Sequence, residues 1–461
     1  MTDSTEAALA ARLSGYRERG VQRIKIAFTD VDGVMRAKYV SLDKFAGLLG
    51  AGGGWCDCVF GWDVDDVLYE QGTFTGWHSG FPDARYWLRL ETERWLDDEA
   101  CPLFLADFAV ANPDCEGEPP PCPRALLQRV LTRLDALGLT LRAGFEYEFF
   151  VFAETAHSVR DKGYRGLTPL SPGNFGYSML RTGEHSQLFG DYMAHCAAMQ
   201  CDLEGLHTET GPGVWEAALA PHNGLEAADR AALLKSLTKI FFSRRDLLAT
   251  FMAKWSMDVP GQSGHFHFSF VDGAGVNQFA DPAAQHGMSS LQRHALAGVH
   301  TLLPQWLAML APTINSYTRL VKGAWAPTAA TWGVENRTAA LRVIASSSAQ
   351  RIECRIPGAD ANPYLVAAAV VAAAIAGIEQ AMSLPEAVQG NAYALQEQLP
   401  EQQQFATTLS AATAQLRASA QARDAFGEHW VEHFAMSRDW ESQEYQRHLN
   451  SWQLERYFEI I

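Results

Sequence analysis

The 461-residue sequence predicts an α+β fold, and three kinds of segment support this prediction. Several segments alternate apolar and polar residues as half-buried β-strands do, and residues 141–152 (LRAGFEYEFFVF) are the clearest of them. Residues 227–252 instead place apolar side chains at helical spacing. Residues 364–378 are almost entirely apolar but shorter than the ~20 residues of a membrane span, so we expect a buried helix there.

The N-terminal part of the chain predicts a β-hairpin. Residues 23–40 contain two alternating segments separated by Asp32 and Gly33, a pair typical of tight turns. Further on, residues 112–123 (NPDCEGEPPPCP) combine prolines and acids that suit neither a helix nor a central strand. We therefore predict two domains, comprising residues 1–116 and 117–461.

Charge and composition exclude several classes of function. The net charge of -16, without a basic stripe, argues against a nucleic-acid partner. The eight cysteines contain no CxxC pair, so we expect reduced thiols rather than a zinc module. The N-terminus lacks a basic region followed by a long apolar one. We therefore expect a cytoplasmic protein without a membrane partner.

The strand predicted at residues 141–152 carries two carboxylates on one face. Glu146 and Glu148 are two residues apart, so their side chains point the same way. Parallel carboxylates repel each other, and burial raises the cost of each charge. A bound cation would remove this repulsion.

Three other segments offer polar side chains next to apolar ones. These residues are His265 and His267 in GQSGHFHFSF, Glu209 and Glu216 in HTETGPGVWEAAL, and Arg351, Glu353 and Arg355 in QRIECRIPG. Each segment alone also fits a solvated or structural role. Taken together, five glutamates and a histidine suit hard divalent cations such as Mg²⁺ or Mn²⁺, and the absence of thiolates disfavours zinc and iron–sulfur clusters.

A cluster of arginines follows between residues 315 and 342. Arg319, Arg337 and Arg342 have the forked donors that bind carboxylates and phosphates, although any one of them also fits a surface ion pair. Carboxylates for metal ions together with arginines for anions predict phosphoryl transfer from a metal–nucleotide complex. Neither a Walker-type loop nor a kinase-type glycine loop is present, so the nucleotide must be held in another way.

From about residue 20 to its end, the sequence resembles the glutamine synthetase family. The motifs that carry the resemblance occur in the family's order: FTDVDG, GFEYEFFVF, ETGPGVWE, SGHFHFS, NSYTRL, ENRTAALR, RIECRIPGADANPYL and ERYFEII. The resemblance implies an N-terminal β-grasp domain and a catalytic domain with a curved antiparallel sheet and surrounding helices. It also implies homo-oligomeric double rings of 10 or 12 subunits, with active sites between subunits.

The same resemblance implies ATP and two or three Mg²⁺ (or Mn²⁺) ions as cofactors, and it assigns roles to residues of this chain. One metal would be held by Glu148, Glu209 and Glu216, and the second by Glu146, His265 and Glu353. The nucleotide would contact His267, Arg337, Arg342 and Lys254. The substrates would contact Arg319, Arg355, Gly264, Trp325 and Asp63, and the catalytic residues would be Arg337, Arg319 and Glu353.

The implied chemistry has two steps. The γ-carboxylate of glutamate attacks ATP to form γ-glutamyl phosphate, from which an amine then displaces phosphate. Family members that use ammonia carry a glutamate in the flap and an aspartate in the N-terminal domain. Here Trp325 stands at the place of that glutamate and Gly61 at that of the aspartate, with Asp63 two residues later.

These departures predict an organic amine in place of ammonia. An indole can stack on an aryl amine or cover an alkylammonium, although Trp325 also fits plain packing of the flap. We therefore predict a ligase that joins glutamate to an organic amine, with small apolar or aromatic amines favoured. The alternatives are a γ-glutamylpolyamine synthetase, an ammonia-using glutamine synthetase and a non-catalytic family member.

Overall fold

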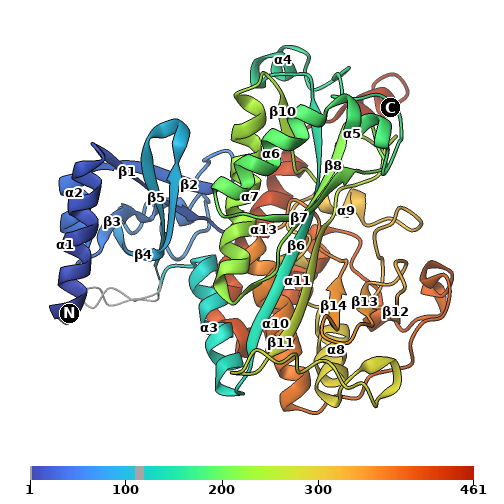
Figure 1. Cartoon of the computed structure of the whole chain (residues 1–461). Helices are drawn as coiled ribbons and strands as arrows, with labels where there is room; N and C mark the ends of the chain where they lie inside the picture. Colours follow the sequence, from blue (N-terminus) through green and yellow to red (C-terminus); the bar gives the residue numbers. More distant parts are fainter. Residues whose placement is uncertain (1–2, 109–118) are drawn as a thin grey trace.

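Two β-sheets organise the chain in the computed structural model, which describes residues 3–108 and 119–461 (Figure 1). The first sheet has the strand order β2-β1-β5-β4-β3. Its strands are β1 (Arg23–Thr29), β2 (Met35–Ser41), β3 (Gly53–Cys56), β4 (Asp83–Leu96) and β5 (Cys101–Asp107). Helices α1 (Asp3–Glu18) and α2 (Leu42–Leu48) accompany it in a separate lobe. The predicted boundary between residues 116 and 117 lies outside the described residues.

The predicted hairpin is confirmed. Strands β1 and β2 pair antiparallel from Arg23 opposite Ser41 to Thr29 opposite Met35. The connecting turn contains Gly33 at a φ of +84°, a backbone conformation that costs glycine little. Strand β1 also runs parallel to β5, so the sheet is mixed.

The second sheet has nine strands and is built around β6 (Thr140–Phe152), the strand predicted at residues 141–152. Its main path is β12-β13-β14-β11-β6-β8-β7, and β9 and β10 also pair with β6. The other strands are β7 (Leu203–Thr208), β8 (Val214–Leu219), β9 (His222–Asn223), β10 (Leu248–Thr250), β11 (Gly264–Val271), β12 (Trp332–Val334), β13 (Leu341–Ile344) and β14 (Arg351–Cys354). All pairings except β12 with β13 are antiparallel, which agrees with the predicted fold class.

Most helices of this part pack against the sheet or against each other. They are α3 (Pro123–Ala136), α4 (Ala156–Asp161), α5 (Met179–Glu184), α6 (Ser186–Ala198), α7 (Leu225–Ser243), α8 (Ser290–Leu302), α9 (Ser316–Arg319), α10 (Pro363–Glu379), α11 (Leu409–Ala418), α12 (Ala420–Phe426), α13 (Glu428–Arg447) and α14 (Ser451–Tyr457). Helix α10 confirms the buried helix predicted at residues 364–378 and packs between α3 and α8. Among the described residues, no helix combines the length and apolar character needed to cross a bilayer.

One predicted helix is shorter than its sequence pattern indicates. Helical spacing continues to residue 252, but α7 ends at Ser243. Asp246 then adopts a φ of +54°, and Leu248–Thr250 pairs with β6 as strand β10. The prediction was wrong over this stretch because hydrogen bonds to a strand distant in sequence outweighed the local pattern.

The FTDVDG motif fastens the N-terminal sheet to the rest of the chain. Asn362 donates hydrogen bonds to the backbone oxygens of Asp30 (2.9 Å) and Val31 (3.3 Å). Arg438 on α13 forms a buried ion pair with Asp32 and donates to the oxygen of Pro312 at 2.8 Å. Burial, followed by the charge of Asp32, raises the pKa of Asp30 to about 7. The loop is therefore a docking element between the two sheets.

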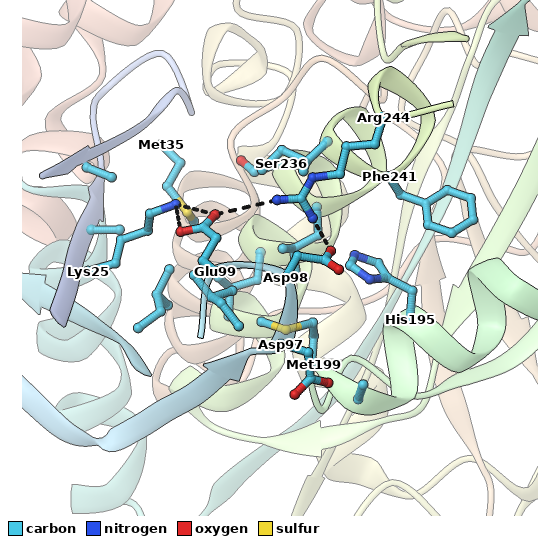
Figure 2. A pocket seen from close by; sticks show the side chains of 18 of the residues that line it. Lys25, Met35, Asp97, Asp98, Glu99, His195, Met199, Ser236, Phe241 and Arg244 are labelled. Atoms are coloured by element: carbon cyan, nitrogen blue, oxygen red, sulfur yellow. Dashed lines mark hydrogen bonds and ion pairs between the residues drawn. The ribbon is translucent and has the colours of Figure 1, made fainter. Parts of the chain in front are cut away.

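The N-terminal sheet also meets helices α6 and α7, and a cavity of about 770 Å³ lies between them (Figure 2). Glu99 lies 2.7 Å from Lys25 Nζ on β1 and 3.8 Å from Arg244 Nη2, just beyond α7. Arg244 also forms an ion pair with Asp98. Mainly apolar side chains from the first sheet and from α6 and α7 form the walls.

Each cysteine in the described part of the chain is a free thiol, as predicted.

Candidate active site

The predicted metal ligands on β6, β8 and β11 meet on one face of the second sheet. Glu146 lies opposite His265 of β11, and Glu148 lies opposite Glu216 of β8. The two-residue period of a strand therefore places Glu146 and Glu148 on the same face, and the two flanking strands bring their polar side chains to that face.

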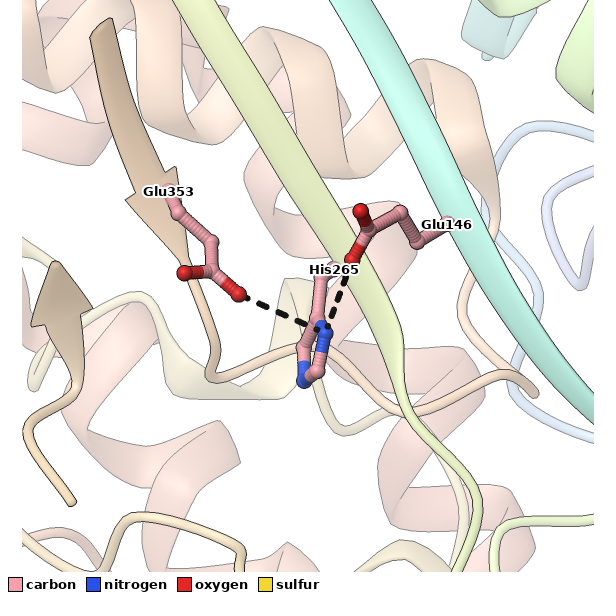
Figure 3. A group of neighbouring side chains, drawn as sticks. All are labelled: Glu146, His265 and Glu353. Carbon is pink, nitrogen blue, oxygen red and sulfur yellow. Dashed lines mark hydrogen bonds and ion pairs between the residues drawn. The ribbon is translucent and has the colours of Figure 1, made fainter. Parts of the chain in front are cut away.

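Glu146, His265 and Glu353 form the first group of possible metal ligands (Figure 3). His265 Nδ1 lies 3.4 Å from Glu146 Oε2 and 3.6 Å from Glu353 Oε1. The side chains come from β6, β11 and β14, and His265 and Glu353 are buried. His265 Nε2 is buried without a hydrogen-bond partner among the described residues. This is the set that the sequence assigned to the second metal.

The charges of this group suit a divalent cation. Burial opposes ionisation of Glu353, but His265 and Arg355 outweigh it and lower the pKa of Glu353 to about 2. Glu146 is half-buried, and burial opposes its ionisation as well, but His267 and His265 lower its pKa well below the usual range. Burial, followed by the charge of Arg355, lowers the pKa of His265, a shift that favours the neutral imidazole required for metal binding. Metal ligands must be deprotonated in this way.

His207, Glu209 and Glu216 form a second group. His207 Nε2 lies 3.2 Å from Glu209 Oε1 and 3.6 Å from Glu216 Oε1. Burial, then the charges of Glu148, Glu146 and Glu209, raise the pKa of Glu216 to about 10. This acidic cluster thus carries more negative charge than its surroundings offset, and a divalent cation fits it.

Two details of the second group differ from the sequence-based set. Glu148 was assigned to this metal, and it adjoins the group through its register with Glu216, but its carboxylate accepts the backbone N–H of Ser263. His207 was not singled out. Its position two residues before Glu209 was the available signal, since both belong to one face of an extended segment.

Two of the predicted arginines pair with Glu353, whereas Arg319 lies in a different environment. Arg342 Nη1 donates to Glu353 Oε2 at 3.1 Å, and Arg355 Nη1 donates to Glu353 Oε1. Arg319 is fully buried and donates to the backbone oxygens of Ile356 (2.9 Å) and Arg355 (3.3 Å) and to Ser263 Oγ (3.0 Å). Its guanidinium therefore holds the backbone of Arg355 and Ile356 in place.

The other predicted residues are more dispersed. Arg337 is exposed in the turn between β12 and β13. Lys254 is buried and donates to the oxygen of Val259 at 2.8 Å. Gly264 begins β11 so close to Gly358 that a Cβ would lie 2.7 Å from the Gly358 oxygen. Only glycine fits this approach without a shift of backbone.

Trp325 and Asp63 do not meet within the chain. Trp325 is 61% exposed and adopts a φ of +58° in the loop after α9. Asp63 instead lies against α13, where its Oδ2 accepts the indole N–H of Trp440 at 2.8 Å. Its Oδ1 accepts the backbone N–H groups of Asp65 and Val67.

A cavity of about 810 Å³ adjoins the first group of ligands. Glu146 and His267 line it, as do Arg142, Glu204, Ser269, Asn277, Ser348 and Arg351. Arg351 Nε donates to His267 Nδ1 at 3.3 Å. The sequence placed Arg351 on the face of Glu353 but assigned it no role; the structure puts it on the wall of a cavity large enough for a small-molecule ligand.

Tyr177 is an aromatic residue that sequence reasoning missed. Its ring stacks on His207 with centroids 4.4 Å apart and an angle of 10° between the planes. The side chain is 73% exposed, so one face of the second ligand group is bordered by an accessible aromatic ring. No strand pattern in residues 164–185 marked this position.

The two ligand groups predict stabilisation by divalent ions. Mg²⁺ or Mn²⁺ at about one hundred times its Kd should add about 2.7 kcal/mol to the free energy of unfolding, because it binds only the folded protein. Thermal unfolding with the ion and with EDTA measures this effect. Glu216→Gln should reduce it, whereas Glu154→Gln is the control, since buried Glu154 pairs with Ser158 and Lys162 instead. If the ion stabilised the wild type, Glu216→Gln and Glu154→Gln equally, Glu216 would not be a metal ligand.

Comparison with known proteins adds independent information. The glutamine synthetase catalytic-domain family matches residues 120–457. The type-1 glutamine synthetase 2 of Dictyostelium discoideum is 42% identical, over 95% of this chain and 84% of that protein. The glutamate–isopropylamine ligase of a Pseudomonas species is 34% identical, over 96% of both chains. A solved structure of a GmaS–ADP complex has a TM-score of 0.83 and 26% identity, over 97% of this chain and 99% of that one.

Proposed function

The chain belongs to the glutamine synthetase family, and from this premise we propose that it is an ATP-dependent ligase that joins the γ-carboxylate of glutamate to an organic amine. The main support is the meeting of Glu146, His265 and Glu353 beside Arg342 and Arg355. Carboxylates for divalent ions and guanidinium groups for anions are what phosphoryl transfer to a carboxylate requires. A non-catalytic role fits poorly, since all six predicted metal ligands are present.

We place ATP in the cavity of about 810 Å³. Its wall contains Glu146 and His267, so phosphates at that end would lie next to the ions. Bound divalent ions, two or three in number, would offset the charge of the transferring phosphoryl group. Arg351 would contact the nucleotide in addition to the predicted Arg337 and Arg342. Lys254 donates a hydrogen bond to the Val259 oxygen, so it would contribute by fixing the loop that joins the two residues.

Glutamate would bind on the other side of the first group, near Gly264 and Arg355. Arg355 is held by Glu353, and Gly264 lets the backbone of Gly358 approach closely. Arg319 is enclosed by backbone oxygens of this region, which supports a role in positioning Arg355 and Ser263. Direct contact between Arg319 and the substrate stays a prediction.

The amine would enter between aromatic side chains. Trp325 supplies an exposed indole at the position of the flap carboxylate used by ammonia-dependent relatives, and Tyr177 borders Glu209. Aromatic faces attract apolar groups and ammonium ions. We therefore favour small apolar or aromatic amines. The similarity to a ligase named for isopropylamine supports this choice, and polyamines and ammonia remain the alternatives.

We further propose a double ring of 10 or 12 subunits with active sites between neighbours. Asp63 lies against α13 of its own chain, and in the proposed ring it would face the active site of an adjacent subunit. A cytoplasmic location stays a prediction.

The proposed function is tested by phosphate release with Mg²⁺–ATP, glutamate and a panel of amines. The panel contains ammonia, methylamine, ethanolamine, isopropylamine, putrescine, spermine and aniline, with each product confirmed by mass. Preference for an organic amine is the expected result. Preference for ammonia would make the protein a glutamine synthetase, and no turnover with any amine would refute the proposal.

Removal of the Trp325 ring should shift amine preference. Trp325→Gly deletes the indole without adding backbone strain, since glycine tolerates its φ of +58°. We expect kcat/KM for the preferred organic amine to fall about 10- to 100-fold, the range for lost apolar contacts in a binding pocket. Trp325→Glu should also raise the activity with ammonia.

The control for this prediction is Trp452→Gly, which removes another exposed tryptophan, located on α14. Kinetic constants for isopropylamine and ammonia would be compared across the variants. An unchanged preference in Trp325→Gly would assign the indole to packing of the flap.

A further inference from the structure

A buried lysine lies beneath the sheet face that carries the ligand groups. Lys235 on α7 is 8% exposed, and its ammonium donates one hydrogen bond, to the oxygen of Ala361 at 2.9 Å. The rest of the ammonium faces the rings of Tyr147 (5.5 Å) and Phe251 (5.8 Å). Desolvation makes such a charge costly, and burial lowers the pKa of Lys235 to about 7.

The hydrogen-bond acceptor belongs to a segment, residues 356–362, that connects several parts of the site. The Ile356 oxygen accepts from Arg319, and the Pro357 oxygen accepts from the backbone N–H of Gly264. Gly358 forms a bridge with Ser263, and the Ala359 N–H donates to the Gln262 oxygen at 3.1 Å. Residues 356–359 thus hold the start of β11.

The remaining residues of the segment form hydrogen bonds with other parts of the structure. Asp360 accepts hydrogen bonds from Thr313 and Ser316, which precede Arg319. Asn362 binds the Asp30–Val31 backbone of the N-terminal sheet. Between these two residues, the Ala361 oxygen is held by Lys235. One segment therefore contacts Arg319, Gly264 and the docking loop, and Lys235 anchors it to α7 near its C-terminal end.

We propose that Lys235 is a positioning residue, whose hydrogen bond to Ala361 fixes the 356–362 segment and thereby sets Gly264 and Arg355 for the glutamate substrate. This inference rests on the proposed function. Lys235 contacts neither nucleotide nor metal ligands in this arrangement; it acts through the backbone. Loss of the bond should loosen glutamate binding and leave the nucleotide cavity, on the other side of the first ligand group, unchanged.

The test compares Lys235→Met with Thr238→Val. Both remove a buried polar group from the same face of α7, but the side-chain hydrogen bonds of Thr238 go to Tyr192 and Leu234 and not to the segment. In Lys235→Met we expect KM for glutamate to rise about tenfold while KM for Mg²⁺–ATP stays within about twofold. Thr238→Val should change neither constant.

Hydrogen exchange of the segment gives a readout that needs no turnover. In Lys235→Met, the amides of Gly358 and Ala359 should exchange about tenfold faster, while amides of β6 keep their rates, because only local opening is affected. Lys235→Gln, which keeps an N–H donor, should lie between the wild type and Lys235→Met, and it serves if Lys235→Met fails to fold. Unchanged exchange in the segment, or acceleration throughout the protein, would overturn the inference.

The kinetic and hydrogen-exchange measurements together distinguish failure of this inference from failure of the proposed function. If the wild type turns over none of the amines but the segment exchanges faster in Lys235→Met, the anchor is real and the assigned reaction is wrong. If the wild type is active and Lys235→Met keeps its KM for glutamate, the inference is wrong and the reaction stands.

Discussion

Replacing Glu353 by glutamine should lower kcat/KM by about 10³-fold or more while the fold is retained. The carboxylate is 1% exposed and lies 3.6 Å from His265 Nδ1. It also accepts hydrogen bonds from Arg342 and Arg355. A neutral amide removes a metal ligand and the negative charge that orients both guanidinium groups. The expected loss corresponds to several kcal/mol of charge stabilisation in the transition state.

The matched control for this substitution is Glu335→Gln. Glu335 also pairs with Arg342, at 2.6 Å, but belongs to neither ligand group and is exposed. We expect its kcat/KM to stay within about threefold, as for a pair near the surface. Mn²⁺ titration should show one binding event fewer in Glu353→Gln, with unchanged circular dichroism. Full activity in Glu353→Gln would exclude the first ligand group as a metal site.

Replacing Arg438 by alanine should lower the free energy of unfolding by about 3–5 kcal/mol, the usual cost of leaving a buried charge without its partner. Arg438 is 3% exposed and holds both Asp32 and the Pro312 oxygen. Its loss would leave the Asp32 carboxylate buried next to Asp30, whose pKa is already raised. The N-terminal sheet should therefore detach more easily.

Urea denaturation measures this effect, and Arg447→Ala is the control. Arg447 lies on the same helix and pairs with Glu444 and Glu70 in an exposed position. We expect its removal to cost less than about 1 kcal/mol. Equal losses in the two variants would show that the docking loop does not depend on the buried pair.

The sequence predicted local elements well where one periodicity dominated. The alternation around Glu146 and Glu148 specified both strand β6 and the shared face of the two carboxylates. The apolar run of α10 specified a buried helix. The helical pattern of residues 227–252 failed after Ser243, where the chain turns at Asp246 and Leu248–Thr250 pairs with β6.

The candidate site was predictable in its chemistry but not in its full membership. Strand spacing and residue type suggested a divalent-ion site, and the resemblance to a family assigned Glu146, His265 and Glu353 to one metal; the structure brings these three together. It adds His207 to the second group and Arg351 to the cavity wall. Both residues lie two positions from a predicted metal ligand, but this spacing alone did not show that they belong to the site.

The sequence by itself determined the strand and helix periods, the kind of ligands and the family, because these depend on residue type and short-range spacing. Only the tertiary structure decided that Glu148 stands opposite Glu216, that Arg319 is enclosed by backbone oxygens, and that Asp63 lies against α13. These facts depend on strand register and helix packing between segments far apart in the chain. Such contacts are set by the burial of the whole core, which no local pattern records.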